Sequence, residues 1–83
     1  MIEQEYQVAF NGKTYTQKHG SPFDRGCADS YYHRLSRPHY WPLGTGRGER
    51  VDAPDMTPDQ IEAYLAGYEF NEQSGDKKDY GDY

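Results

Sequence analysis

The chain has 83 residues and a net charge of −5, and only 34% of its residues are hydrophobic, so one small domain is expected. Its single cysteine, Cys27, allows no intrachain disulfide, which excludes a disulfide-stapled secreted mini-protein. No apolar run reaches the length of a membrane helix, and the N-terminus lacks a basic segment followed by an apolar one, so a cytoplasmic location is expected.

Aromatic residues and charges are unevenly distributed. Nine Tyr, three Phe and one Trp outnumber the Ile, Val and Leu residues, so the core must depend on aromatic rings, and some rings are expected at the surface. Tyrosine and tryptophan at a surface are typical interface anchors. All five arginines lie within residues 25–50, which carry a net charge of +3, whereas residues 52–83 carry −7. The chain therefore has a basic middle and an acidic end.

The first predicted element is a β-hairpin over residues 4–18. Apolar and polar residues alternate on both sides of Asn11-Gly12. This dipeptide is the strongest short signal for a hairpin, because both turn positions require a positive φ.

Ser21-Pro22 predicts the start of a first helix, since Ser is a preferred N-cap and Pro is pre-organised for the first helical position. Pro38 ends this helix by Arg37 at the latest. Gly26 disfavours the helix by about 1 kcal/mol relative to Ala, which indicates either a close approach to the backbone or an imperfect helix. Apolar residues recur every four positions and predict a buried stripe of Phe23, Cys27, Tyr31 and Leu35.

Residues 38–56 form a connection of a length that is usually functional or disordered. Within it, Arg50-Val51 is a candidate edge strand that would extend the hairpin. A second helix is predicted from Thr57-Pro58, where Gln60 completes a capping box, to about Phe70. Its apolar stripe consists of Ile61, Tyr64, Leu65 and Tyr68.

These elements predict one α+β domain over residues 1–70, in which an N-terminal β-hairpin packs against two α-helices joined by a long connecting loop. The polar residues 71–83 predict a flexible acidic C-terminal tail. The expected core consists of Tyr6, Val8, Phe10, Phe23, Cys27, Tyr31, Leu35, Ile61, Leu65 and Tyr68.

Three patterns that could carry enzyme or cofactor chemistry are weak. Cys27, His33 and His39 lack any recognised zinc spacing. Nothing marks Cys27 as an exposed, electropositive thiol, which a catalytic thiolate requires. The glycine-rich residues 44–48 lack the Lys-Ser/Thr ending of a phosphate-binding loop. We therefore expect no enzyme, no metal and no cofactor.

The segment that stands out combines arginines with aromatic rings around the end of the first helix. Arginine offers a planar fork for phosphate or carboxylate, and aromatic rings offer stacking surfaces or rigid anchors for a protein. The alternative is that Tyr31 and Trp41 are core residues and that the arginines pair with the acidic second helix. The candidate partner-binding residues are Tyr32, Arg34, Arg37, His39, Tyr40 and Trp41.

Residues 21–70 resemble a group of small phage-encoded proteins of unknown function. The resemblance is carried by DRGCADSYYHR at residues 24–34, by Pro38-His39, and by AYLAGY at residues 63–68. A weaker similarity links the chain to ribosome modulation factor, through a Gly-and-Ala helix start, a later proline and an aromatic-Gly pair in the second helix. The phage resemblance implies an accessory protein made during infection, in the host cytoplasm, of a kind that commonly binds and redirects or inhibits a host macromolecule.

We therefore expect a non-catalytic protein that binds and modulates or inhibits a host macromolecule, in the first place a protein. One alternative is nucleic-acid or ribosome binding through the same arginine and aromatic residues. Another is an acidic inhibitor that mimics DNA with the carboxylates of residues 52–83. The alternatives depend on whether the arginines are exposed or paired within the chain.

Overall fold

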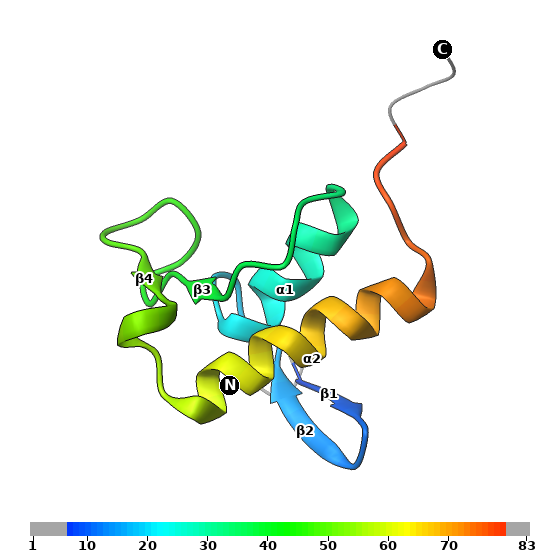
Figure 1. Ribbon diagram of the computed structural model, residues 1–83, viewed down its shortest axis with the longest axis horizontal. Helices are drawn as coiled ribbons and strands as arrows, with labels where there is room; N and C mark the ends of the chain where they lie inside the picture. Colours follow the sequence, from blue (N-terminus) through cyan, green and yellow to red (C-terminus); the bar gives the residue numbers. More distant parts are fainter. Residues whose placement is uncertain (1–6, 80–83) are drawn as a thin grey trace.

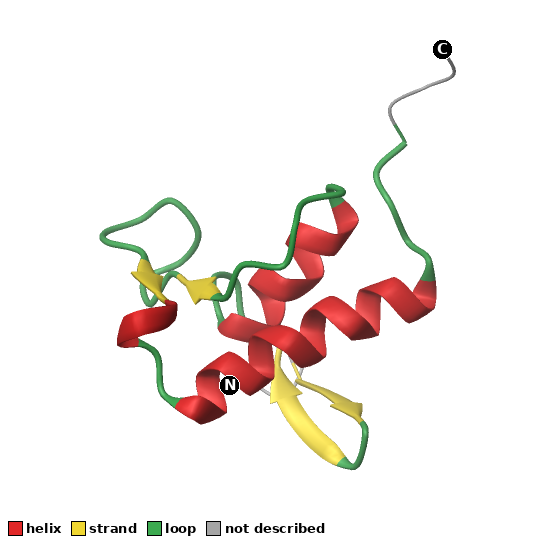
Figure 2. Cartoon of the chain, in the orientation of Figure 1, coloured by secondary structure: helices red, strands yellow, loops and turns green. Residues whose placement is uncertain are grey.

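The computed structural model describes residues 7–79. A β-hairpin is followed by two helices, which confirms the predicted α+β fold (Figures 1 and 2). No helix in the described part of the chain is long and apolar enough to cross a membrane. In chain order the elements are β1 (Gln7–Phe10), β2 (Lys13–Thr16), α1 (Pro22–Tyr31), β3 (His39–Tyr40), β4 (Val51–Asp52), a 3-10 turn η2 (Ala53–Asp55) and α2 (Pro58–Ser74).

The hairpin forms around the predicted turn, with strands within residues 7–16, and residues 4–6 of the predicted range lie outside the described residues. Asn11 and Gly12 both have positive φ, at 54° and 80°, and β1 pairs antiparallel with β2. The Tyr15 ring of β2 stacks on Phe23 of α1 with 4.9 Å between ring centroids. On β1, Phe10 meets Phe70 of α2 edge to face at 5.4 Å. The hairpin thus packs against both helices through aromatic rings.

The two helices cross with their backbones in contact at two glycines. A Cβ atom on Gly26 of α1 would overlap the carbonyl oxygen of Tyr64, and a Cβ atom on Gly67 of α2 would overlap that of Phe23. The Cys27 thiol donates a hydrogen bond to the Gly67 carbonyl at 3.3 Å. Close approach therefore explains a glycine inside each helix, despite a propensity cost of about 1 kcal/mol each.

The core lies around this crossing. Its most buried large side chains are Tyr64 and Phe23, and Tyr15 and Ala66 are buried beside them. The core prediction is wrong for two residues. Leu35 is 72% exposed, because α1 has already ended, and Leu65 is 47% exposed. Tyr6 lies outside the described residues. The remaining members of the predicted core are half-buried: Val8, Phe10, Cys27, Tyr31, Ile61 and Tyr68.

The first helix ends within its predicted limit, and the second runs further than predicted. Tyr32 caps α1, and His33 then takes a left-handed conformation with a φ of 63°, so the helix stops well before Pro38. The capping box of Thr57 and Gln60 begins α2 as predicted, but the helix runs to Ser74 rather than Phe70. Residues 71–74, which the sequence assigned to the tail, are therefore helical.

The segment after α2 lies against the end of α1. The Lys78 amide donates to the Tyr31 carbonyl at 2.8 Å, and Lys77 Nζ reaches the Ser30 carbonyl at 3.0 Å. Ser30 is fully buried and donates its hydroxyl to Glu72 at 2.7 Å. Hydrogen bonds from Lys77 and Ser30 hold the pKa of Glu72 below its usual value. The remaining four residues of the predicted tail, 80–83, lie outside the described range.

The long connection contains a second two-stranded sheet. Arg50-Val51 was predicted to extend the hairpin, but β4 pairs with β3 instead, in the register His39 to Asp52 and Tyr40 to Val51. The Trp41 amide donates to the Gly20 carbonyl at 2.7 Å, which ties this sheet to the start of α1. The connection is therefore folded against α1.

Alkaline pH is expected to destabilise the fold. Burial raises the pKa of Cys27 and of Tyr15 to about 12 each, and the Tyr15 hydroxyl also donates to Glu62 at 2.6 Å. In the unfolded chain these protons leave near the ordinary values of 9.0 and 10.0. Their contribution to stability is therefore complete below pH 9 and falls as the pH rises toward 12.

Urea unfolding followed by circular dichroism at pH 8 and at about pH 10.5 measures this loss. The Tyr15→Phe variant should lose less stability between the two pH values than the wild-type chain, because one of the groups with a raised pKa is gone. Exposed Tyr32→Phe serves as the matched control and should keep the wild-type slope. Equal stability of the wild-type chain at both pH values would contradict the prediction.

Candidate functional site

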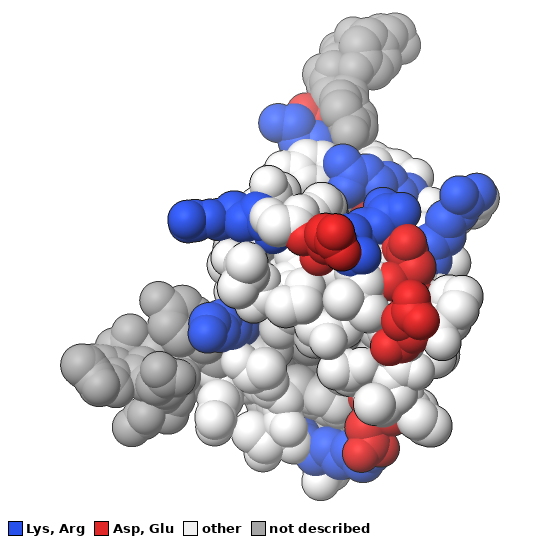
Figure 3. All heavy atoms as spheres, turned by 90° about the vertical axis from the view of Figure 1, so that its left-hand side faces the viewer, with Lys and Arg blue, Asp and Glu red and all other residues white. Residues whose placement is uncertain are grey.

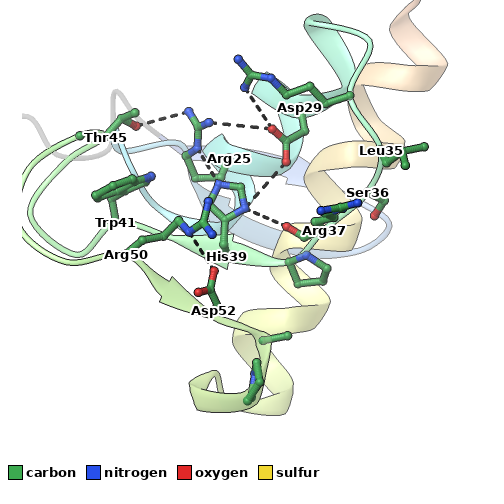
Figure 4. Close-up of a pocket in the computed structure, with 15 residues that line it drawn as sticks. Arg25, Asp29, Leu35, Ser36, Arg37, His39, Trp41, Thr45, Arg50 and Asp52 are labelled. Carbon is green, nitrogen blue, oxygen red and sulfur yellow. Dashed lines mark hydrogen bonds and ion pairs between the residues drawn. The ribbon is translucent and has the colours of Figure 1, made fainter.

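An open cleft of about 860 Å³ lies between α1, the segment that follows it, and the β4–η2 region (Figure 4). Four arginines line the cleft: Arg25 from α1, Arg34 and Arg37 from the segment after it, and Arg50 from just before β4. Trp41 forms one side of the cleft, and Leu35 and Ser36 lie on the other. We refer to this feature as the arginine cleft.

Asp29 organises the floor of the arginine cleft. Only 4% of this residue is exposed, and its carboxylate accepts a hydrogen bond from the Tyr64 hydroxyl. The Arg34 guanidinium donates to it at 3.3 Å, Arg25 Nη2 lies 3.9 Å away and His39 Nδ1 lies 3.8 Å away. A buried carboxylate is stable only when it is paired and hydrogen-bonded. Asp29 meets that condition and fixes two of the cleft's arginines.

His39 is buried and accepts a hydrogen bond from Arg25. Its Nε2 accepts from Arg25 Nε at 3.2 Å, and its Nδ1 faces the Arg37 carbonyl at 2.8 Å. Because a guanidinium only donates, Nε2 is the acceptor in the contact with Arg25, and Nδ1 is the ring nitrogen that can donate to the Arg37 carbonyl. Arg25 also donates from Nη1 to the Thr45 hydroxyl at 3.4 Å. The Arg25 guanidinium is thereby held by three neighbours: Asp29, His39 and Thr45.

Tyr64 connects α2 to the arginine cleft. Its hydroxyl donates to Asp29 and accepts from the Arg37 amide at 3.0 Å. Burial raises the pKa of Tyr64 well above its ordinary value, and the hydrogen bond to Asp29 is the second largest cause. The hydroxyl therefore remains protonated and can keep both bonds. It holds the backbone of the segment after α1 against the core.

The structure brings four of the six predicted contact residues together. Arg34, Arg37, His39 and Trp41 line the arginine cleft, although the His39 ring is buried in its floor. Side chains alternate along a strand, so Tyr40 faces away from its neighbours.

The other two predicted residues lie outside the cleft lining. The Tyr40 hydroxyl accepts from Gln60 Nε2 of α2 at 3.1 Å. Tyr32 is exposed at the end of α1, and the Arg34 guanidinium lies 5.0 Å from the centroid of its ring. Tyr32 therefore adjoins the arginine cleft through Arg34.

Sequence reasoning missed Arg25, Arg50 and Asp29 as site residues. Arg25 and Asp29 are visible in the sequence as an i,i+4 pair, which indicates a common helix face. Arg50 has no such local signal, because it joins the cleft only through the pairing of β4 with β3.

The predicted alternative, in which the arginines pair with the acidic second helix, is wrong for residues 7–79. Arg25 and Arg34 pair with Asp29, and Arg50 Nε pairs with Asp52 at 2.8 Å. The guanidinium of Arg37 makes no ion pair within the described residues. Figure 3 views the side of β4 and shows basic side chains gathered in its upper part, with carboxylates between them and along one edge.

Two further observations bear on the site. Within the part of the chain that the structure describes, no three His, Cys, Asp or Glu residues are placed to hold a metal ion together. Comparison of the chain with protein-family models, with curated proteins and with solved structures finds no match.

Proposed function

We propose that the chain is a non-catalytic phage accessory protein that binds a host protein through the arginine cleft and its rim, and thereby modulates or inhibits it. The observation that carries the proposal is the Arg37 guanidinium, which makes no ion pair within residues 7–79 and lines one concave surface with the half-exposed side chains of Arg34 and Arg50. The phage origin and the host cytoplasm as its location are supported by the resemblance carried by residues 24–34, Pro38-His39 and residues 63–68.

Exposed apolar groups beside the arginines favour a protein partner over nucleic acid. Leu35 lines the cleft and is largely exposed, and Tyr32 is exposed beside Arg34. Nucleic-acid affinity comes mainly from many phosphate contacts along a basic track. Here the arginines are confined to one cleft of a chain with a net charge of −5. An arginine-rich concavity with an apolar rim is instead typical of a protein interface centre.

The chemistry of Cys27 and His39 supports stoichiometric binding rather than catalysis. The Cys27 thiol is bonded to the Gly67 carbonyl, and burial raises its pKa to about 12, so it is protonated at neutral pH. Both ring nitrogens of His39 are engaged by Arg25 and Arg37. Neither group is available as a nucleophile or a general base.

Charge reversal at Arg37 tests the proposal. Affinity-tagged protein expressed in a bacterial host should retain a specific partner after nuclease treatment. Arg37→Glu should weaken this binding about tenfold or more, because a repulsive charge replaces an attractive one in the cleft lining. The measurement is the amount of partner recovered at a series of tagged-protein concentrations.

Arg47→Glu is the matched control, because Arg47 is exposed, lies outside the cleft lining and makes no ion pair within the described residues. Its partner recovery should equal that of the wild-type chain. Recovery of nothing above background would overturn the proposal. Loss of the partner on nuclease treatment would favour the nucleic-acid alternative instead.

A further inference from the structure

The arginine cleft has more positive charge than its own carboxylates neutralise. Four guanidinium groups line it, whereas Asp29 and Asp52 are its only acidic lining residues within the described chain. The cleft therefore has a surplus of two positive charges, and a ligand that matches it is a dianion.

The guanidinium groups also retain free donors for such a ligand. Arg50 uses Nε for Asp52, and Arg34 uses Nη1 for Asp29. Arg37 makes no side-chain hydrogen bond within residues 7–79. Each guanidinium has five N–H donors in a planar fork that matches the oxygens of a phosphate group. Three partly free forks therefore face one concave space.

We propose that the arginine cleft binds a phosphomonoester carried by a side chain of the partner protein, with Arg37 as its principal ligand. The inference rests on the proposed function and names the chemical group that the cleft recognises. A phosphomonoester carries about −1.5 to −2 charges at neutral pH and offers three acceptor oxygens. A carboxylate neutralises one charge and offers two oxygens, so it leaves the cleft half compensated.

The size and lining of the cleft fit a phosphate on a side chain better than a free ion. A volume of about 860 Å³ leaves room for the group that carries the phosphate. Apolar lining from Leu35, Pro38, Trp41 and Pro54 provides contacts for that group. Arg25 contributes its charge from a fixed position in the floor, since Asp29, His39 and Thr45 hold it.

Trp41 is the only tryptophan in the chain, so its fluorescence reports on the cleft directly. We would titrate the full chain with three matched peptides, carrying phosphotyrosine, tyrosine or glutamate at one position. The phosphotyrosine peptide should bind at least about tenfold more tightly than the glutamate peptide, because it supplies the second charge. Arg37→Ala should remove about tenfold of that affinity, and Arg47→Ala should remove none.

Equal affinity for the phosphotyrosine and glutamate peptides, no fluorescence change, or equal effects of the two substitutions would overturn the inference. Tighter binding of adenosine monophosphate than of the phosphopeptide would also overturn it, in favour of a nucleotide ligand. A host protein that is retained equally before and after its phosphatase treatment would preserve the proposed function and exclude the phosphate. A preference for the phosphopeptide with no retained host protein would support the phosphate site and exclude the proposed function. Circular dichroism of each variant shows that it is folded.

Discussion

Replacement of Gly67 by alanine is expected to lower the free energy of unfolding by about 3 kcal/mol. The added methyl group would occupy the position of the Phe23 carbonyl, so the helices must move apart at their crossing. Helix propensity alone would make the same change favourable by about 1 kcal/mol. A loss of stability would therefore report the backbone contact itself. Urea unfolding followed by far-ultraviolet circular dichroism measures this loss of stability. Gly26→Ala should lower the free energy of unfolding by a similar amount.

Glu69→Ala provides the matched control for this substitution. Glu69 is an exposed residue of the same helix, so its replacement should change stability by no more than about 0.5 kcal/mol. A domain of this length has a total stability of roughly 4–12 kcal/mol, so the loss at Gly67 would be a large fraction of the total. An alanine at position 67 that stabilised the protein would show that the helices do not cross in this way.

The second large effect is expected at Asp29, where replacement by asparagine should cost about 3 kcal/mol of stability. The change would leave the largely buried Arg25 guanidinium, 12% exposed, without a counter-charge and would present an amide to groups that already donate. The Arg34 and Tyr64 hydrogen bonds to the carboxylate would weaken with it. Because Asp29 also fixes two of the cleft's arginines, binding of the partner should fall in the same variant.

Asp52→Asn separates this effect from simple loss of a negative charge. Asp52 pairs with Arg50 at the surface, and an exposed pair of this kind contributes about 0–1 kcal/mol. Tyr64→Phe should cost about 1–3 kcal/mol, since it leaves the Arg37 amide without its acceptor. The double variant of Asp29 and Tyr64 should lose less than both single changes together, because the two share a hydrogen bond. Wild-type stability of Asp29→Asn would refute the buried network.

The parts of the fold that sequence predicts are those set by neighbours in the chain. Asn11-Gly12 fixes the hairpin turn, and Thr57 with Gln60 caps α2, because each signal acts over four residues or fewer. Leu65 was misplaced because it and Tyr64 both fit the apolar period of α2. The close contact at Gly67 decides which of them faces α1, and a helix period alone does not contain that information.

The site residues also divide into those that local sequence signals predict and those that depend on long-range contacts. Arg34 and Arg37 were found because arginines and aromatic residues cluster in the sequence itself. Leu35 was assigned to the core because the left-handed turn at His33, which ends α1, has no glycine to announce it. Arg50 reaches the cleft only through the pairing of two short strands that are distant in the sequence. Long-range pairing of two-residue strands leaves no periodic pattern to detect.

The glycine crossing has a consequence for the genetics of this protein. At both Gly26 and Gly67 the obstacle to a methyl group is the main chain of the opposite helix rather than a side chain. A defect that arises from side-chain crowding can be relieved by a smaller residue opposite it, but a main-chain carbonyl cannot be made smaller. Loss of either glycine should therefore have no local second-site suppressor, and the two positions should be reverted only at their own codons.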